Sequence, residues 1–336
     1  MSKEITMQDI ASMLGISKVT VSKALNNKDG VGQELRKKIL DIAEKYNYHL
    51  PQKVKAEALI GKKVAVFCSD KYFDTSDSGY FYIKIYTQIT EELAKKDIVA
   101  SLLTVKENMD YQSLKSFLYA QEFDGIILLG NLPRRFSQFL GNIDIPLVFV
   151  DSDRGVLDGD SVIIENFYST YNITKYLIEN GHRQIGFIGT INTTQSINDR
   201  YLGFCRAMME RELPICREWI IDDRTKENTH REMDLPRTLP TAFVCNCDFS
   251  AYHFEKLLIK NGMRVPEDVS IVSFDNDSFA EISPVPLTTV SINIDDMVQK
   301  VVFLLIERIQ GTTLSKNLTQ MVDTDIIYRG SVRSIL

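Results

Sequence analysis

The sequence predicts a small all-α head followed by an α/β core of two lobes, each built on a doubly wound parallel sheet. Three observations predict this class. Short amphipathic helices fill the first fifty residues, apolar strand-like runs alternate with helical segments from about residue 63 onward, and the alternation occurs in two successive series. At 336 residues, the chain is long enough for two or three folding units.

The composition is that of a globular protein, with 44% apolar and 25% charged residues. No run suits a transmembrane helix and the start lacks a secretory signal, so we expect a cytoplasmic protein without membrane contact. Five cysteines without regular spacing indicate reduced thiols. Cys245 and Cys247 lack a second Cys or His pair at zinc-site spacing, so they are interpreted as buried apolar residues. Neither a metal nor a cofactor is expected.

The net charge of −6 is unevenly distributed along the chain. Residues 1–60 hold ten Lys and Arg against seven Asp and Glu, a difference of +3, and the remainder holds 29 against 38, a difference of −9. A basic head on an acidic core is typical of a protein whose head contacts nucleic acid and whose core does not. An excess of three charges is also compatible with an ordinary solvated surface.

Three short helices are predicted in the head. Thr6 caps a helix that ends at Gly15, Ser17 caps a second helix over residues 18–26, and a third begins near Gln33. Helices joined by so short a glycine turn indicate a helix-turn-helix, although a generic three-helix bundle has the same periodicity. The second helix directs six polar, basic or apolar side chains outward: Lys18, Val19, Thr20, Ser22, Lys23 and Asn26.

The order of residues decides between these alternatives. The runs 5–11 (ITMQDIA) and 15–26 (GISKVTVSKALN) closely resemble the head of the lac-repressor family of DNA-binding transcriptional regulators. The resemblance implies that Lys18, Val19 and Lys23 face base edges in the major groove. It also implies that the DNA backbone is held by Thr6, Ser17, Thr20, Ser22 and Asn26.

The run 51–62 (PQKVKAEALIGK) resembles the family's hinge, which becomes helical on operator DNA and wedges a leucine into the minor groove. Leu59 is the matching leucine. The run departs from the family's hinge in two ways. The interval from Tyr48 to Leu59 is two residues longer than usual, and Gln52 replaces an asparagine. A plain linker helix is the alternative.

The core is expected to alternate strands and helices, which implies parallel sheets with right-handed crossovers and a cleft at the carboxyl ends of the strands. The expected strands are 64–68, 98–103, 125–129, 147–150, 162–164, 185–188, 242–244 and 269–274. The expected helices are 80–96, 111–120, 168–180, 199–211 and 251–261.

This core resembles the family core, which is related to periplasmic sugar-binding proteins. The landmarks that carry the resemblance are 123–128 (FDGIIL), 181–189 (GHRQIGFIG), 200–204 (RYLGF), 265–275 (VPEDVSIVSFD) and 286–290 (PLTTV). The resemblance implies a head at 1–48, a hinge at 49–62 and a core at 63–336. Within the core, it implies an N-lobe of about 63–162 plus 292–320 and a C-lobe of about 163–291 plus 321–336. No leucine heptads follow the core, so a homodimer is expected and not a tetramer.

Five residues are candidates for binding a small-molecule effector in the cleft: Asp151, Ser196, Arg200, Asp248 and Asp275. Carboxylates and a guanidinium supply the directed hydrogen bonds that a polyhydroxylated molecule needs. A structural role stays open, in which Arg200 and Asp275 pair with each other or cap helices. His182 is interpreted as an exposed turn residue, because it follows a helix stop at 180–181.

Two departures from the family fall in this region. Cys247 replaces an asparagine beside the pocket aspartate. The charged segment 223–239 is about three residues short and has Arg224 where an aromatic residue is usual. Losing an aromatic that stacks on a sugar ring weakens the case for a simple sugar. Arg224 favours an acidic ligand if it faces the cleft, and we expect it to point to solvent.

The function that these features favour is sequence-specific transcriptional repression. A dimer would bind a near-palindromic operator under the control of a sugar-like effector. The alternative is a regulator whose core responds to a non-sugar ligand or to a partner protein. An enzyme is not expected, because the sequence holds neither GxGxxG, a phosphate loop, a nucleophile elbow nor clustered metal ligands. A free solute-binding protein is disfavoured by the absent signal and the intact head.

Overall fold

The computed structural model describes residues 6–25, 30–45, 59–73, 79–106, 108–140, 143–152, 159–226, 228–311 and 317–336. The chain divides into two compact units, residues 1–56 and residues 57–336. The second unit begins six residues before the predicted core boundary at 63, so the end of the predicted hinge belongs to the core.

The head contains α1 (Met7–Leu14), α2 (Lys18–Leu25) and α3 (Gln33–Lys45), as predicted. Thr6 caps α1 in a capping box, accepting from Asp9 N at 3.2 Å while its own N donates to the Asp9 carboxylate at 2.8 Å. Gly15 ends the helix at φ 64°, where glycine is favoured. The buried core of the head combines residues of all three helices: Ile10, Ala11, Val21, Ala24, Ile39 and Ala43.

The N-lobe sheet has the strand order β11-β5-β4-β3-β1-β2, and every pairing is parallel. Helices α4 and α11 cover one face, and α5 and α6 cover the other, as the two hydrophobic clusters show. The strands are β1 (Lys63–Ser69), β2 (Val99–Val105), β3 (Gly125–Leu129), β4 (Leu147–Val150), β5 (Asp160–Ile164) and β11 (Thr319–Val322). The helices are the short η2 (Asp70–Phe73), α4 (Gly79–Ala94), α5 (Tyr111–Gln121), α6 (Arg134–Leu140) and α11 (Ile294–Ile309).

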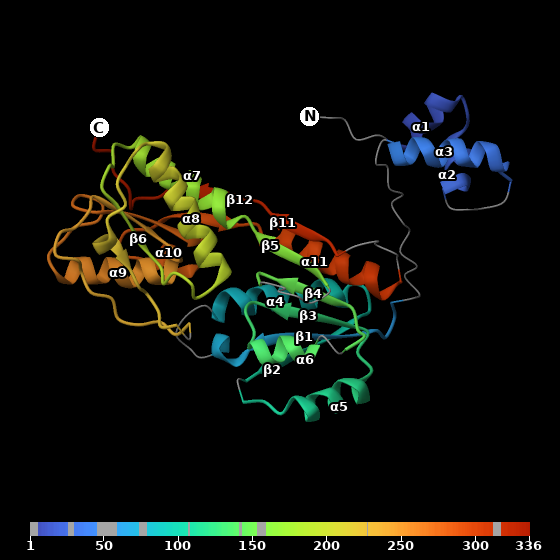
Figure 1. The fold of residues 1–336 in the computed structure, drawn as a ribbon, viewed down its shortest axis with the longest axis horizontal. Coiled ribbons are helices and arrows are strands. Elements are labelled where there is room, and N and C mark those ends of the chain that lie inside the picture. The colour runs from blue at the N-terminus through green and yellow to red at the C-terminus, as the bar shows by residue number, and fades with distance from the viewer. Residues whose placement is uncertain are drawn as a thin grey trace. The chain divides into compact units, whose positions relative to one another are not determined.

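The C-lobe sheet has the order β12-β10-β9-β8-β6-β7 and is parallel except for β12, which runs antiparallel to β10. Helices α7 and α8 cover one face and α9 and α10 the other (Figure 1). The strands are β6 (Ile185–Ile188), β7 (Ile220–Ile221), β8 (Ala242–Cys245), β9 (Ser270–Asp275), β10 (Thr288–Ile292) and β12 (Thr324–Ile327). The helices are α7 (Asn166–Glu179), α8 (Gln195–Glu210), η3 (Arg217–Trp219), α9 (Asp248–Lys260) and α10 (Ser278–Ile282).

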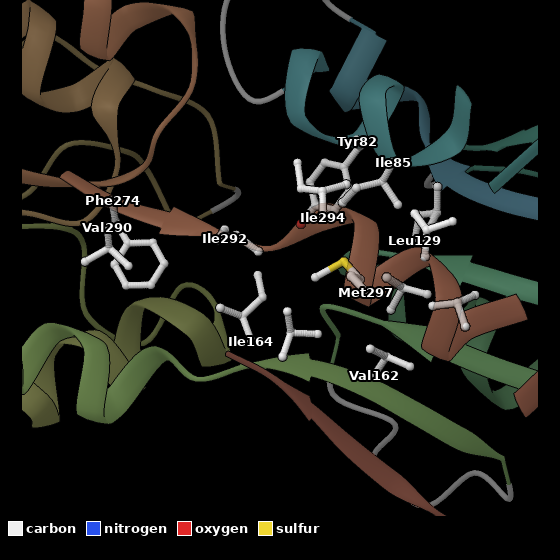
Figure 2. Close-up of a cluster of buried hydrophobic side chains, with 14 of the residues drawn as sticks. Tyr82, Ile85, Leu129, Val162, Ile164, Phe274, Val290, Ile292, Ile294 and Met297 are labelled. Carbon is white, nitrogen blue, oxygen red and sulfur yellow. The ribbon is translucent and has the colours of Figure 1, made fainter. Parts of the chain in front are cut away.

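The chain crosses between the lobes three times, at Glu165, Asn293 and Asp323. The predicted boundaries at 162, 292 and 320 are therefore one or two residues early, because each strand runs to its end before the chain leaves its sheet. Apolar packing continues across the crossings. Figure 2 shows Ile292 and Ile294 on either side of Asn293, between Phe274 of the C-lobe and Met297 of the N-lobe.

Two general properties of the described residues bear on function. In that part of the chain, no helix is long and apolar enough to cross a membrane. The same residues hold no group of three His, Cys, Asp or Glu side chains that could bind a metal ion.

Candidate functional site

The exposed face of α2 is the candidate nucleic-acid interface. Lys18 and Lys23 are exposed and Val19 is 64% exposed, whereas Val21 and Ala24 are buried on the opposite side. An exposed valine between two lysines has no packing role in the head, which suits contact with base edges. Of the six residues predicted to point outward on this helix, Lys18, Val19 and Lys23 are exposed and Thr20 and Ser22 are half-buried. Asn26 lies outside the described residues.

Ser17 and Thr20 have a local structural role at the start of α2. Thr20 N donates to Ser17 Oγ at 3.0 Å, and the two hydroxyl oxygens lie 2.8 Å apart. Ser17 is therefore a helix cap, as predicted, and its hydroxyl is held at the end of the helix. A capped N-terminus also presents the positive end of the helix dipole, which favours a phosphate.

Leu59 does not lie where the hinge prediction put it. Its side chain is 1% exposed and belongs to the hydrophobic cluster of the core. Lys62 N donates to Leu59 O at 3.1 Å, and Gly61 N donates to Asp97 O at 3.1 Å, so residues 59–62 form a turn fixed to the core. In this conformation the Leu59 side chain is not available to DNA, and its insertion into the minor groove on operator DNA stays a prediction. The rest of the predicted hinge, residues 49–58, lies outside the described residues.

The core has a cleft between its two lobes, lined by polar, charged and aromatic side chains of both. The N-lobe wall includes Asp151 and two tyrosines whose rings contact each other at a tilt, and the C-lobe wall includes Ser196, Arg200 and Asp275. Four of the five predicted effector residues therefore meet at one cleft. The Ser196 hydroxyl lies 3.0 Å from the Thr194 hydroxyl at the start of α8.

The N-lobe wall is built from a carboxylate and two aromatic rings. Asp151 follows β4 with φ 50°, a left-handed conformation uncommon outside glycine. Tyr82 Oη donates to Asp151 Oδ2 at 2.9 Å, and the rings of Tyr82 and Tyr72 lie 4.1 Å apart. Burial raises the pKa of Asp151 to about 6, although the charge of Arg200 and the Tyr82 hydrogen bond lower it. The wall thus combines apolar surface with a carboxylate, the combination that binds a sugar ring.

Arg200, on α8, links both sides of the C-lobe wall. Its Nε donates to Asn166 Oδ1 at 2.8 Å, its Nη1 donates to the Asn246 carbonyl, and its charge lies 3.7 Å above the ring of Phe274. Asp275 Oδ1 lies 3.4 Å from Arg200 Nη2. The pairing that the sequence left open is therefore present, and it coexists with a position on the cleft wall.

Asp248 does not line the cleft, contrary to prediction. Its side chain is fully buried and accepts hydrogen bonds from the Ser273 hydroxyl, from Thr289 Oγ1 at 2.6 Å and from Asp277 N at 2.8 Å. Asp248 therefore ties α9 to β9 and β10. Its position in the first turn of a helix turns the carboxylate inward over the sheet, so its role is structural.

Arg224 does not point to solvent, contrary to prediction. It is 8% exposed and lines the cleft. It donates to Asp223 through Nε at 3.1 Å and Nη2 at 2.8 Å, and to Asn228 Oδ1 through Nη1 at 3.0 Å. Burial alone would raise the pKa of Asp223, but the charge and hydrogen bonds of Arg224 hold that pKa well below its usual range. The pair is bidentate, which sequence alone does not predict for adjacent residues.

The side chains of Cys247 and His182 are both buried. Cys245 and Cys247 are buried, as predicted, and burial raises the pKa of the Cys247 thiol to about 12, so this thiol is protonated at neutral pH. His182 is 1% exposed, contrary to prediction, with Nδ1 2.9 Å from Thr241 Oγ1 and Nε2 3.1 Å from Arg333 O. Its ring joins the loop after α7 to residues near 333.

Several further residues that the sequence does not predict as binding residues line the cleft. They are Tyr72, Phe81, Tyr82, Asn131, Arg224, His230, Asn246, Phe249 and Asp277. Asp277 had a detectable signal, because it lies two residues after Asp275 at the carboxyl end of the same strand. The others come from helices and loops whose approach to the cleft depends on tertiary structure.

Two family descriptions match the chain. Bacterial regulatory proteins of the lacI family match residues 6–51, and the periplasmic binding protein-like domain matches residues 174–332. The HTH-type transcriptional repressor PurR of Actinobacillus pleuropneumoniae serotype 3 (strain JL03) is 30% identical over 338 residues, which cover 98% of this chain and 99% of the relative. The chain belongs to the lacI family. PurR of Pasteurella multocida (strain Pm70) is 29% identical over the same shares of the two chains.

Solved structures of lacI-family regulators share the fold. The transcriptional regulator CelR in complex with cellobiose superposes with a TM-score of 0.69 at 21% identity, covering 97% of this chain and 99% of that one. The lac repressor dimer bound to operator and an anti-inducer gives 0.64 at 19% identity, covering 98% and 100%. As a lacI-family protein, the chain is a DNA-binding transcriptional repressor with a small-molecule effector.

Proposed function

We propose that the cleft binds a sugar-like effector and that its occupancy controls the affinity of the head for a near-palindromic operator. The observation that carries the proposal is that directed polar groups from both lobes, Asp151 on one side and Arg200 and Asp275 on the other, line one cleft together with aromatic side chains. A polyhydroxylated ring needs this combination, because its hydroxyls require hydrogen-bond partners and its C–H faces require apolar contact.

The coupling to DNA follows from the three crossings at Glu165, Asn293 and Asp323. A ligand that contacts both walls binds better when the lobes are closed, so it shifts the population toward closure. Lobe closure changes the distance between the points at which the two hinges of a homodimer join their cores, and so the spacing of the two heads. Two recognition helices must enter successive major grooves about one helical turn apart, so such a change alters operator affinity. We place this activity in the cytoplasm, where the operator DNA is, and we expect no catalytic turnover of the effector.

The test combines ligand binding with operator binding. A thermal-shift screen with neutral sugars, nucleosides and organic acids should find a ligand that stabilises the core, by about 2.7 kcal/mol at a hundred-fold excess over its Kd. The shift should disappear in Ser196→Ala and Arg200→Ala and stay in Lys96→Ala, which changes an exposed residue that does not line the cleft. The same ligand should change the affinity for an operator selected from random duplexes. A ligand that binds without changing operator affinity would contradict the proposal.

A second candidate is a core that responds to a non-sugar ligand or to a partner protein. The observation that favours it is the buried Arg224, which lies on the cleft wall with Asn228 and His230. An absence of thermal shifts across the screen, together with a partner that co-purifies and alters operator binding, would support this second function.

A further inference from the structure

The charges on the cleft wall do not balance. In the described part of the chain, five side chains that are charged in their ordinary states line the cleft, namely two arginines and three aspartates: Arg200, Arg224, Asp151, Asp275 and Asp277. The Arg224 charge is already matched from behind the wall by Asp223, in a bidentate pair that is almost fully buried. One arginine, Arg200, therefore faces three carboxylates. His230 adds no positive charge at neutral pH, because burial and then the charge of Arg224 lower its pKa to about 4.

Arg200 neutralises its neighbours only weakly. Its Nε and Nη1 donate to the neutral oxygens of Asn166 and Asn246. The carboxylate of Asp275 lies 3.4 Å from Nη2, longer than a good charge-assisted hydrogen bond. Asp277 accepts from Phe279 N at 2.7 Å as the cap of α10, a neutral donor that leaves its charge unbalanced. The excess negative charge is thus shared by the two walls, with Asp151 on the N-lobe side and with Asp275 and Asp277 against Arg200 on the C-lobe side.

The titration behaviour of these groups agrees with the geometry. Burial and then the charge of Asp275 raise the pKa of Asp277 to about 7. Burial also raises the pKa of Asp151 to about 6, with Asp275 contributing in the same direction and Arg200 opposing. Such shifts mark sites where a nearby cation is energetically favoured and a second anion is not.

Building on the proposed function, we propose that the effector carries a protonated amine, which Asp275 and Asp277 receive on the C-lobe wall. The amine-bearing molecule is an amino sugar or a similar amino polyol. Asp151, on the N-lobe wall, would approach the same cation as the lobes close, so the cation joins the two walls electrostatically. The aromatic rings of Tyr82 and Phe249 supply cation-binding faces in the same cleft. A phosphorylated or carboxylated ligand would add an anion to a wall that already holds an excess.

The experiment is isothermal titration calorimetry of the full chain with matched ligands that differ in one group. For the glucose, galactose and mannose series, the ligands are the neutral sugar, the 2-amino sugar, its N-acetyl derivative and the 6-phosphate. In at least one series the amino sugar should bind ten-fold or more tightly than its neutral N-acetyl derivative, and the 6-phosphate should bind most weakly. Because Asp277 is partly protonated at pH 7, binding of the amine should release protons, measured from buffers of different ionisation enthalpy.

Two variants test whether Asp277 produces the preference for the amino sugar over its N-acetyl derivative. Asp277→Asn keeps the side chain's cap on α10 and removes the charge, and it should reduce the ratio of amino-sugar to N-acetyl affinity at least three-fold and abolish most of the proton release. Asp222→Asn, an exposed residue outside the cleft, should change neither. Binding of a neutral sugar with no advantage for its amino form would overturn this inference and leave the sugar-responsive function standing. Tighter binding of a 6-phosphate would also overturn it, and binding of no ligand in the panel would count against both.

Discussion

Arg224 Nη2 lies 2.8 Å from Asp223 Oδ2, and the two side chains are 8% and 0% exposed. Adjacent residues rarely form so complete a buried ion pair. Asp223 also accepts from Thr190 N at 3.0 Å, from Asn246 Nδ2 at 2.6 Å and from Ser250 Oγ at 2.5 Å. The pair thus joins the segments after β6, β7 and β8 where they approach the cleft.

Removing Arg224 should destabilise the core strongly. Arg224→Met leaves Asp223 charged and buried without its cation, which costs about 3–5 kcal/mol of unfolding free energy. The double variant Asp223→Asn with Arg224→Met should recover a large part of that loss, because neither charge remains. Urea unfolding followed by circular dichroism measures both. Arg264→Met removes a partner of Asp268 at a similar distance of 2.9 Å on the surface and should have a much smaller effect.

Leu59 provides a test of where the hinge ends. Because its side chain is buried in the core, Leu59→Ala should lower the free energy of unfolding by about 2–5 kcal/mol. Ile60→Ala is the matched control, since Ile60 is 65% exposed, and it should change stability by less than about 0.5 kcal/mol. If Leu59→Ala instead has the same free energy of unfolding as Ile60→Ala but loses operator affinity, the result would support the minor-groove role predicted from the sequence.

The recognition helix can be tested through its salt dependence. Lys18→Ala should weaken binding to a selected operator about ten-fold or more and flatten the preference among single-base variants of that operator, because a base-reading contact is lost. Loss of a phosphate contact would instead weaken all sequences alike and reduce the slope of log affinity against log salt by about 1. Fluorescence anisotropy at several salt concentrations separates the two results, with Lys96→Ala in the core as a control that should change neither.

The free energy of unfolding should depend on pH through the titration of Asp277. Its pKa is raised from 3.8 to about 7 in the folded core, so between these values the folded state holds a proton that the unfolded state has lost. This contribution to stability is present in acid and is lost as the pH rises toward 7, with a slope of at most about 1.4 kcal/mol per pH unit.

Asp277→Asn should remove that dependence. The variant should gain stability relative to the parent chain as the pH rises from about 5 to 8, by about 2–4 °C in Tm for each kcal/mol. Differential scanning fluorimetry across this range measures the difference. A constant difference between the two chains at all pH values would contradict the raised pKa.

The local elements of the fold were predictable from sequence because their signals are local. Gly125–Leu129 and Ile185–Ile188 were predicted with the bounds that the structure shows, since each is an apolar run next to polar or helix-stopping residues. No element was predicted beyond 274. The short strands β11 and β12 are partly exposed and lack a clear apolar alternation, and their place in the sheets depends on pairing with distant strands.

The site was predictable to the extent that side-chain direction follows from a strand end. Asp151 and Asp275 follow or end parallel strands and reach the cleft, as predicted. Asp248 and Arg224 were predicted wrongly because their directions depend on partners far along the chain. Asp248 points inward, where it accepts hydrogen bonds from Ser273 and Thr289. Arg224 is held at the cleft wall by hydrogen bonds to Asn228 and Asn246.

The order in which strands enter the two sheets constrains how the chain folds during synthesis. β11 pairs with β5 and β12 pairs with β10, so each lobe receives an edge strand from residues 319–327. Neither sheet is complete until these residues have left the ribosome, whereas the head needs only the first 45. In a nascent chain, the DNA-binding head can therefore fold well before the two sheets of the core are complete. A chain that ends anywhere before these strands would carry the complete head without a complete core.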